Sequence, residues 1–424
     1  MIAFVRRVLA GLFLVVSVEA AAARDLSGRV YDDLTGAAIP FAVVTTAGRP
    51  VIADASGAFS VQEVGDALQI RAPGYARREI MTATVTGNSV DVGLAGFTPK
   101  ALYLSFYGVG SQILREGVLK MIRETALNAV VIDVKGDRGM IAYRSGVLLA
   151  TVVGAQKIIT IKDLPGLLSA LHEEGIYSIA RIVAFKDDPL GRARPDLALK
   201  TDDGTVFQDR EGLRWVDPNS SEVRDYNISI AEEVAKAGFD EIQFDYLRFP
   251  DSSHIRYGLP NTKAMRTQAI DAFLDAARTR LAPYNVFLSA AVFGYICWNL
   301  DDTQIGQTLE DMLPRVDYLS PMLYPSGFQF GIPGYRNPVG NPYEIVKRSL
   351  DRARERSQVS PLRLRPWLQA FPDYAFDRRS FDSPEIREQI RAAEDFGSDG
   401  WMLWNPRNVY SDPGLEPEKT AACW

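Results

Sequence analysis

Apolar and polar residues alternate along much of the chain with the period of two that marks β-strands. The clearest case is residues 239–250, FDEIQFDYLRFP, in which the apolar Ile242, Phe244 and Tyr246 lie two positions apart and Asp245 falls between two of them. A helical pattern precedes this segment and stops at Gly238. In parallel α/β proteins the chemistry gathers at the carboxyl ends of strands. Asp245 is therefore a candidate working carboxylate, and the alternative is a buried Asp that fixes a loop.

Eight segments of this kind follow one another in the second, larger part of the chain. They are residues 101–107, 129–135, 177–185, 241–248, 286–295, 317–323, 364–371 and 400–404. Helical patterns lie between them, the clearest at 163–174, 221–237, 262–281, 343–356 and 383–396. This alternation predicts an α/β fold, a (β/α)₈ or TIM barrel, over residues 101–410.

The first hundred residues have a different character. Residues 1–23 have Arg6 and Arg7, an apolar run and a small-residue cleavage site, which predicts a signal peptide and an exported protein, periplasmic or extracellular. Residues 25–95 show short alternating segments separated by Gly, Pro and Asp, which predicts a small all-β domain. Residues 96–100 form a linker, and residues 411–424 are a C-terminal tail.

The β domain resembles the carboxypeptidase regulatory-like sandwich, which is similar to transthyretin. The residues that carry the resemblance are Gly28, Val30, Asp54, Gly57, Phe59, Gly74 and Tyr75. The resemblance implies an accessory domain without catalysis, with cell-envelope components as candidate partners.

Composition narrows the chemistry. The 424 residues have a net charge of −6 and no long basic run, so nucleic acid is not an expected partner. Two histidines, His172 and His254, and two cysteines without a CxxC motif predict neither a metal site nor a cofactor. A disulfide between Cys297 and Cys423 stays open.

The polar residues at the predicted strand ends form the candidate site. We expect Asp245 and Asp133 to be catalytic, with carboxyl groups roughly 5–10 Å apart, because period-two alternation can aim both into one barrel mouth. One carboxyl would protonate the leaving oxygen of a glycosidic bond while the other attacks the anomeric carbon or activates water. Asp245 sealed against a cation, with no cavity above it, would count against this. The expected substrate-binding residues are Lys135, Asp137, Arg181, Asp187, Arg248, Tyr324, Gln369, Asp373, Trp404 and Asn405.

Aromatic side chains near the same strand ends suit sugar rings. Tyr107, Tyr324, Trp367 and Trp404 could stack on them, and simple packing is the alternative for each. For Lys135 and Arg181 the alternative is a buried ion pair that braces the barrel.

The segments VVIDVKGDRGMIAY, WVDPNSSEVRDYNISIAEEVAKAGFDEIQFDYLRFP, VDYLSPMLYPSGF, LRPWLQAF and GWMLWNP together resemble a barrel family named as putative glycoside hydrolases and once classed as a domain of unknown function. The resemblance covers about residues 101–410 and implies the barrel fold and glycoside hydrolysis. Two positions depart from the family pattern, because Ala291 and Ala370 stand where acidic residues are common. A weaker likeness to chitinase-like barrels places Leu247 where their catalytic glutamate lies.

Three functions are consistent with these patterns. The first is an exported glycoside hydrolase that acts on a polysaccharide or oligosaccharide. The second is a carbohydrate-binding barrel that has lost catalysis, which Ala291 and Ala370 favour. The third is a cell-envelope scaffold that docks through the β domain.

Overall fold

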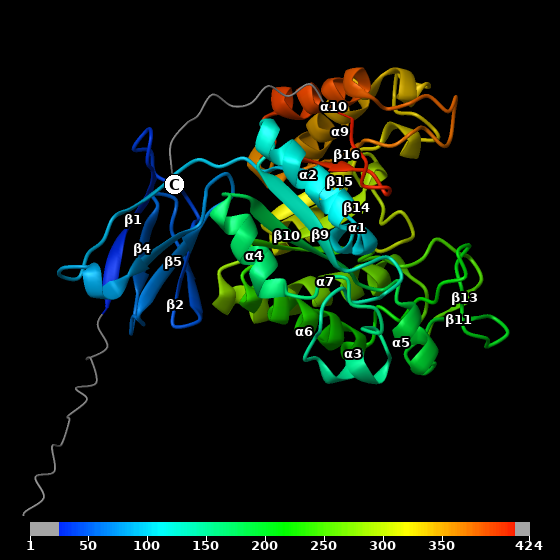
Figure 1. Cartoon of the computed structure of the whole chain (residues 1–424), viewed down its shortest axis with the longest axis horizontal. Coiled ribbons are helices and arrows are strands. Elements are labelled where there is room, and N and C mark those ends of the chain that lie inside the picture. The colour runs from blue at the N-terminus through cyan, green and yellow to red at the C-terminus, as the bar shows by residue number, and fades with distance from the viewer. Residues whose placement is uncertain (1–24, 412–424) are drawn as a thin grey trace, which may run out of the picture.

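A computed structural model describes residues 25–411 of the chain, so the predicted signal peptide and Cys423 lie outside the described residues. Its larger part is a closed barrel of parallel strands in the order β10-β12-β14-β15-β16-β17-β8-β9 (Figure 1). The barrel strands are β8 (Lys100–Leu104), β9 (Ala129–Lys135), β10 (Tyr177–Val183), β12 (Glu241–Asp245), β14 (Phe287–Phe293), β15 (Tyr318–Met322), β16 (Trp367–Gln369) and β17 (Trp401–Trp404). All eight predicted strands are present, and the TIM-barrel prediction is confirmed.

Helices surround the barrel. They are α1 (Phe106–Gly110), α2 (Gln112–Glu124), α3 (Leu148–Val152), α4 (Leu164–Glu173), α5 (Asp188–Ala193), α6 (Ser221–Ala237), α7 (Lys263–Leu281), α8 (Leu309–Met312), α9 (Pro342–Ser357) and α10 (Ser383–Phe396). The predicted bounds of α6 and α10 match those observed, and Gly238 ends α6 in the left-handed region at φ 117°. Helix α2 is not among the clearest helices of the sequence pattern, although its Val118 and Ile122 are buried one helical turn apart. No helix among residues 25–411 is long and apolar enough to cross a bilayer.

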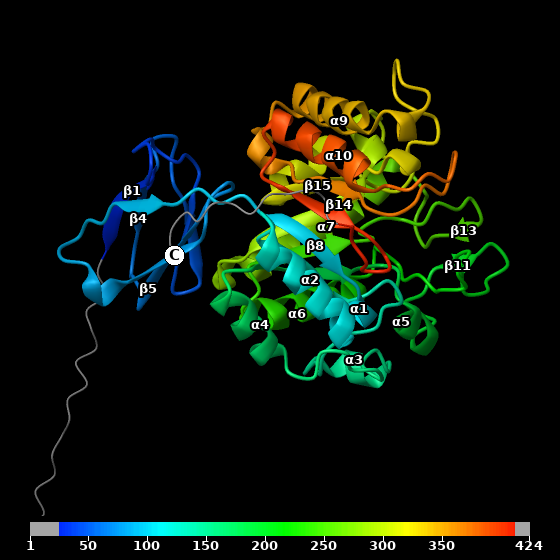
Figure 2. The ribbon, with the colours of Figure 1, turned by 45° about the horizontal axis from the view of Figure 1, so that its top comes forward.

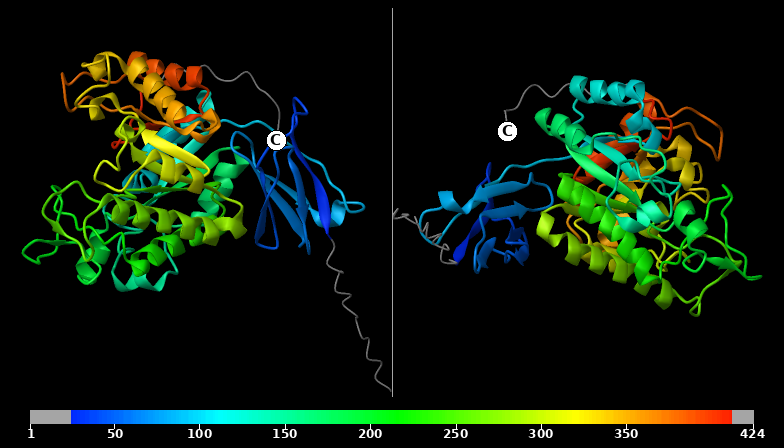
Figure 3. Two further views of the ribbon diagram at one scale, coloured as in Figure 1. Left: turned by 180° about the vertical axis from the view of Figure 1, so that it is seen from behind. Right: turned by 60° about the horizontal axis from the view of Figure 1, so that its bottom comes forward.

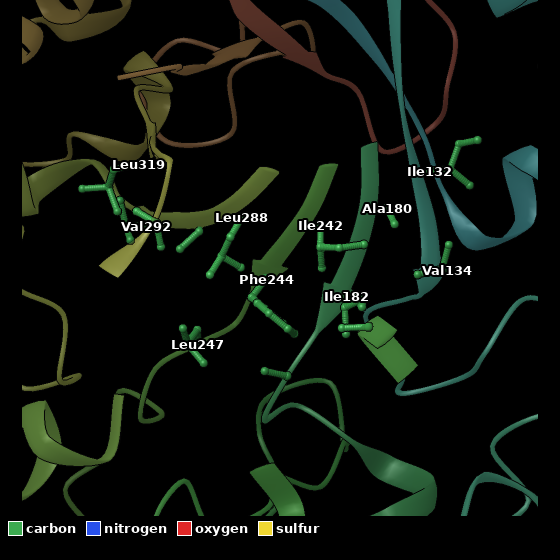
Figure 4. Close-up of a cluster of buried hydrophobic side chains, with 14 of the residues drawn as sticks. Ile132, Val134, Ala180, Ile182, Ile242, Phe244, Leu247, Leu288, Val292 and Leu319 are labelled. Atoms are coloured by element: carbon green, nitrogen blue, oxygen red, sulfur yellow. The ribbon is translucent and has the colours of Figure 1, made fainter. Parts of the chain in front are cut away.

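The two faces of the barrel strands carry different side chains. Apolar residues on the outer face, such as Ile132, Ile182 and Phe244, pack under the helices in one continuous core (Figure 4). The inner face is mixed. On β12 it presents Glu241, Gln243 and then Asp245, which gives three polar levels from the bottom of the barrel to its mouth.

The polar side chains in the middle of the barrel interior are hydrogen-bonded to one another. Gln243 donates to Ser289 and Ser320 and accepts a hydrogen bond from Trp367 Nε1 at 3.0 Å. Trp367 is therefore part of the barrel interior, 1% exposed, and cannot stack on a sugar in this structure. The packed middle level closes the barrel below the mouth.

The N-terminal domain consists of two small sheets, in the orders β4-β1-β7 and β3-β2-β5-β6. Their strands are β1 (Leu26–Asp32), β2 (Val43–Thr46), β3 (Arg49–Ile52), β4 (Ala58–Val61), β5 (Ala67–Arg71), β6 (Arg78–Met81) and β7 (Val92–Leu94). Side chains from both sheets, including Val30, Val44 and Ile70, share one hydrophobic cluster. The all-β prediction is confirmed, and the resemblance to the carboxypeptidase regulatory-like subtype stays a prediction.

The β domain docks on the end of the barrel where the strands begin, opposite β11 (Lys200–Thr201) and β13 (Ile255–Arg256) (Figures 1, 2 and 3). Arg71 donates to Asn285 Oδ1 at 3.1 Å, and Arg77 pairs with Asp240. The backbone N–H of Gly74 donates to Asp399 at 3.2 Å. Cavities of 420 and 630 Å³ lie along this domain interface, away from the barrel mouth.

A buried ion cluster lies at the same end of the barrel. Arg365 donates to Glu241 and to Asp399, and all three side chains are fully buried. Burial raises the pKa of Glu241 and of Asp399, while Arg365 opposes that rise. The Arg365 guanidinium is therefore the positive charge that stabilises the ionised forms of both buried carboxylates.

We expect Arg365→Met to lower the free energy of unfolding by about 3–5 kcal/mol, because it leaves two buried carboxylates without their cation. Urea unfolding of the purified protein measures this. Arg352→Met on α9 is the matched control, since Arg352 is half-exposed and pairs only with Glu355 on the surface, a contact worth less than about 1 kcal/mol. Equal effects of the two substitutions would contradict the assignment.

Candidate active site

The mouth of the barrel is organised around Arg181, which is 1% exposed on the inner face of β10. Its Nη1 donates to Asp133 Oδ1 at 2.7 Å, and its Nε and Nη2 donate to Asp245 Oδ2 at 2.9 and 2.7 Å. Its Nη2 also donates to Asp137 Oδ1 at 2.8 Å. One guanidinium thus gathers three carboxylates from two segments: β9 with the turn that follows it, and β12.

Asp133 is the most enclosed of the three. Its second oxygen accepts hydrogen bonds from Tyr103 Oη at 2.7 Å and from the backbone N–H of Phe106 at 3.2 Å, and the residue is 2% exposed. Burial, opposed by Arg181 and reinforced by the charge of Asp137, raises the pKa of Asp133 to about 6. The direction follows from the charge count, because one cation cannot neutralise three carboxylates in a desolvated site.

Asp245 is held from both sides. Oδ2 binds Arg181, and Oδ1 accepts the backbone N–H of Tyr246 at 2.6 Å. The side chain keeps only 9% of its surface exposed. Asp245 is therefore nearly buried and paired with a cation, which is the arrangement expected to count against Asp245 as a catalytic carboxylate.

Asp137 is the carboxylate that reaches solvent, with 39% of its side chain exposed. It sits on a turn closed by a hydrogen bond from the Gly139 N–H to the Gly136 carbonyl. Gly139 has φ 77°, and a Cβ there would lie 2.5 Å from Asp187 Oδ1. Only glycine fits this turn without a shift of Asp187.

The structure places Lys135 and Asp187 outside the mouth, which corrects their expected role in substrate binding. Their side chains form a fully buried ion pair of 2.8 Å, and Lys135 Nζ also donates to Asn227 of α6. The register of β9 against β10 shifts by one residue at this point, since Arg181 faces Asp133 and Ile182 faces Lys135. This bulge turns Lys135 from the inner face, where strict alternation would put it, to the outer one.

Gln369, Asp373 and Asn405 also brace the rim instead of lining a cup. Gln369 Nε2 donates to Ser326 Oγ at 2.7 Å, and that hydroxyl donates to Asp373 at 2.7 Å. Burial raises the pKa of Asp373, but the hydrogen bonds from Ser326 and from the backbone N–H groups of residues 375, 376 and 378 outweigh it and hold the pKa well below its usual range. Asn405 Nδ2 donates to the carbonyls of residues 370 and 409.

Partly exposed aromatic side chains border the cluster. Trp404 stacks on Tyr103 with ring centroids 3.9 Å apart, and the Arg181 guanidinium lies 4.8 Å from the Trp404 ring centroid. Tyr324 packs against Phe371. Burial raises the pKa of Tyr324, the charge of Asp245 adds to the rise, and the charge of Arg181 opposes it. Trp404 and Tyr324 thus stand where they were expected, and Tyr107 is exposed on α1.

Arg248 stands apart from the carboxylates in a cage of three rings. Its guanidinium carbon lies 4.9, 5.2 and 5.3 Å from the ring centroids of Trp215, Tyr246 and Phe293. Trp215, Phe293 and the Tyr103 hydroxyl that donates to Asp133 are not among the site residues expected from the sequence. The inward register of Tyr103 on β8 could have indicated that residue, but nothing in the sequence links Trp215 to Arg248.

The departures from the family pattern are both buried. Ala291 is 1% exposed and packs in the barrel interior, and Ala370 is 5% exposed at the end of β16.

Cys297 is buried and free among residues 25–411, so its pairing with Cys423 stays untested. His172 binds Asp240 at the docking end, and His254 is largely exposed near Asp202.

Comparison with known proteins identifies the family of the barrel. The model of the family DUF4015, described as "Putative glycosyl hydrolase domain", matches residues 101–410. A hypothetical protein from Ruminiclostridium thermocellum ATCC 27405 is 34% identical over 45% of this chain and 96% of its own, with a TM-score of 0.40. No curated protein matches.

Two solved structures are similar in fold. The PgaB (BpsB) glycoside hydrolase domain from Bordetella bronchiseptica is 14% identical over 73% of this chain and 95% of its own, with a TM-score of 0.51. The β-galactosidase from the psychrophilic Marinomonas ef1 is 13% identical over 72% of this chain and 54% of its own, with a TM-score of 0.51. Together with the matched family model, the barrel and its mouth lead to one conclusion: the chain belongs to the putative glycosyl hydrolase family DUF4015.

Proposed function

We propose that the protein is an exported glycoside hydrolase that cleaves a polysaccharide with Asp245 and Asp137. The observation that carries the proposal is that both carboxylates bond to the same nitrogen, Arg181 Nη2, at 2.7 and 2.8 Å. Two bonds from one planar nitrogen diverge, which places the bonded oxygens about 5 Å apart. That separation suits a retaining mechanism, whose carboxyl groups lie about 5–5.5 Å apart.

The environments of the two carboxylates suggest their roles. Asp245 is anchored by Arg181 and by a backbone N–H, as a nucleophile must be if it is to meet the anomeric carbon at a fixed position. Asp137 has a side chain that is 39% exposed and can therefore reach a leaving oxygen or a water at the mouth. In the first step Asp137 protonates the leaving oxygen while Asp245 bonds to the anomeric carbon. In the second, Asp137 takes a proton from water as the water oxygen displaces Asp245.

This assignment differs from the sequence-based pair in the place of Asp133. Arg181, Tyr103 and Phe106 donate to Asp133, and its side chain is 2% exposed, against 9% for Asp245 and 39% for Asp137. Asp133 is proposed as a positioning residue that fixes Arg181, which in turn orients Asp137 and Asp245.

A carbohydrate-binding barrel without catalysis is the second candidate. The pairing of Asp245 with Arg181 and the alanines at 291 and 370 favour it. Sugar contact would then rest on Trp404, Tyr324 and the exposed edge of Asp137.

We expect the purified protein to release reducing ends from at least one member of a panel of envelope and extracellular polysaccharides. Asp245→Asn and Asp137→Asn should each lower that rate by about 100-fold or more, because each removes an acid–base or nucleophilic group. The matched control is Asp225→Asn on the outer side of α6, where Asp225 is 62% exposed, and it should leave the rate unchanged.

Two further outcomes test the retaining mechanism and the choice between hydrolase and carbohydrate-binding barrel. Proton NMR of the first product should show the anomeric configuration of the substrate, and an inverted product would rule out the Asp245–Asp137 pair as drawn. Binding without release by the wild-type protein would favour the carbohydrate-binding barrel.

We also expect Asp133 to leave a signature in the pH dependence of stability. Its pKa of about 6 in the folded protein lies above the usual range, so the folded state binds more protons than the unfolded state between about pH 4 and 6. Its contribution to stability is present at low pH and is lost as the pH rises through about 6. The free energy of unfolding of the wild type minus that of Asp133→Asn should therefore fall, on the order of 1–3 kcal/mol, across this window.

Asp188→Asn is the control for this measurement. Hydrogen bonds from Arg214 and Arg192 outweigh burial and lower the pKa of Asp188, so its contribution should be constant above about pH 4.5. A wild-type-minus-Asp133→Asn difference that is flat or rises with pH would contradict a raised pKa at Asp133.

A further inference from the structure

Arg248 is a half-buried cation without an anionic partner at the barrel mouth. In the described part of the chain, no carboxylate lies within ion-pair distance of its guanidinium, and its one hydrogen bond is from Nη1 to the backbone carbonyl of Phe249 at 3.0 Å. The charges of Asp245, Asp251 and Asp209 act on it without a direct contact. Arg181, Arg266 and Arg365, which are also buried, each have carboxylate oxygens within 2.9 Å. A guanidinium has five N–H donors, so most of those of Arg248 are free for a ligand.

The surroundings hold Arg248 in place without using those donors. Trp215 comes from the segment before α6, Tyr246 follows β12 and Phe293 ends β14, and the three rings contact the guanidinium through their π systems. Aromatic contacts fix a cation but do not replace the hydrogen bonds of its edge. Burial lowers the pKa of Arg248, which marks the cost of removing this charge from water.

The neighbouring cation shows the contrast. Lys186 also lies over the Tyr246 ring, at 5.2 Å, but it is neutralised by Asp209 and Glu211 at 3.4 and 3.1 Å. Of the two cations on this ring, Lys186 therefore has direct ion pairs, whereas Arg248 has none with a described carboxylate. Arg248 follows Asp245 by three residues, on the segment that leaves β12.

We propose that Arg248 is a subsite for the carboxylate of a uronic acid residue in the substrate. A planar carboxylate can accept two parallel N–H bonds from a guanidinium, and it would share the space between the flat rings. The cluster at Asp133, Asp137 and Asp245 has more negative than positive charge, so an acidic sugar needs a separate cation to be held next to it. This inference rests on the proposed function for the polysaccharide class, and it names the substituent that the site selects.

The test compares acidic polymers with their own neutral forms. Polygalacturonate, alginate and hyaluronan are each paired with a carboxyl-reduced counterpart, and dextran sulfate is paired with dextran. Calorimetry at fixed ionic strength should show at least one uronate polymer bound about 10-fold or more tightly than its reduced form, the size of one charged hydrogen-bond pair.

Variants then assign the preference to the residue. Arg248→Gln should abolish the preference for the acidic form and leave binding of the reduced form unchanged, whereas Arg248→Lys should keep part of it. Arg352→Gln, which removes a distant surface charge, should change neither. A merely structural role for Arg248 would weaken both forms equally and would overturn the proposal.

Other outcomes also count against the subsite. Equal binding of acidic and reduced polymers, preference for the sulfated polymer alone, or no binding to any member would each overturn it. Binding does not require cleavage, so the two proposals fail separately. A retained uronate preference without released reducing ends would reject the hydrolase, and cleavage of neutral polymers without the preference would reject only the subsite.

Discussion

The arrangement of the barrel mouth depends on the guanidinium of Arg181. A closed barrel brings the ends of β9, β10 and β12 together: β9 and the turn after it carry Asp133 and Asp137, β12 carries Asp245, and β10 between them carries Arg181. Three negative charges in a desolvated site would repel one another, and the planar fork of Arg181 makes their approach possible by giving each a direct bond. The same fork sets the distance between Asp137 and Asp245, so the proposed chemistry and the stability of the mouth have one origin.

A second arginine, Arg365, pairs with buried carboxylates at the other end of the barrel. Arg365 joins Glu241 to Asp399, and the Asp399 oxygen that binds Arg365, Oδ2, also accepts a hydrogen bond from the Gly74 N–H of the β domain. The ionic cluster that closes the bottom of the barrel is thus also part of the domain interface. The β domain caps the end where the strands begin, which leaves the mouth free of it.

The sequence predicted the fold well because hydrophobic periodicity is a local signal. Eight alternating segments and their helices were sufficient to specify the barrel, and Arg181, Asp133, Asp137 and Asp245 do meet at its mouth. The predicted side-chain positions were wrong where the strand geometry is irregular. Lys135 was assigned to the inner face by strict alternation, and the bulge in β9 moved it outward.

The remaining site residues depend on contacts between distant segments. Gln369 and Asp373 looked like sugar ligands because they follow a strand, yet Ser326 from another loop takes up their hydrogen bonds. Trp215 is far from Arg248 in sequence and contacts it only because the loop before α6 folds over the mouth. Such pairings are set by tertiary packing, which no spacing rule in a single sequence reports.

The peptide between Asp245 and Arg248 joins the charged cluster to the aromatic cage. Tyr246 has φ 49°, a left-handed conformation that costs a non-glycine residue on the order of 1–3 kcal/mol. The turn directs the Tyr246 N–H onto Asp245 Oδ1 and places its ring against Trp215 and Arg248. A strained backbone conformation persists only where several contacts hold it. For Tyr246 these contacts are with Asp245 on one side and with Trp215 and Arg248 on the other, and all three residues lie at the mouth. The geometry of Asp245 and the position of Arg248 are therefore coupled through one residue, Tyr246.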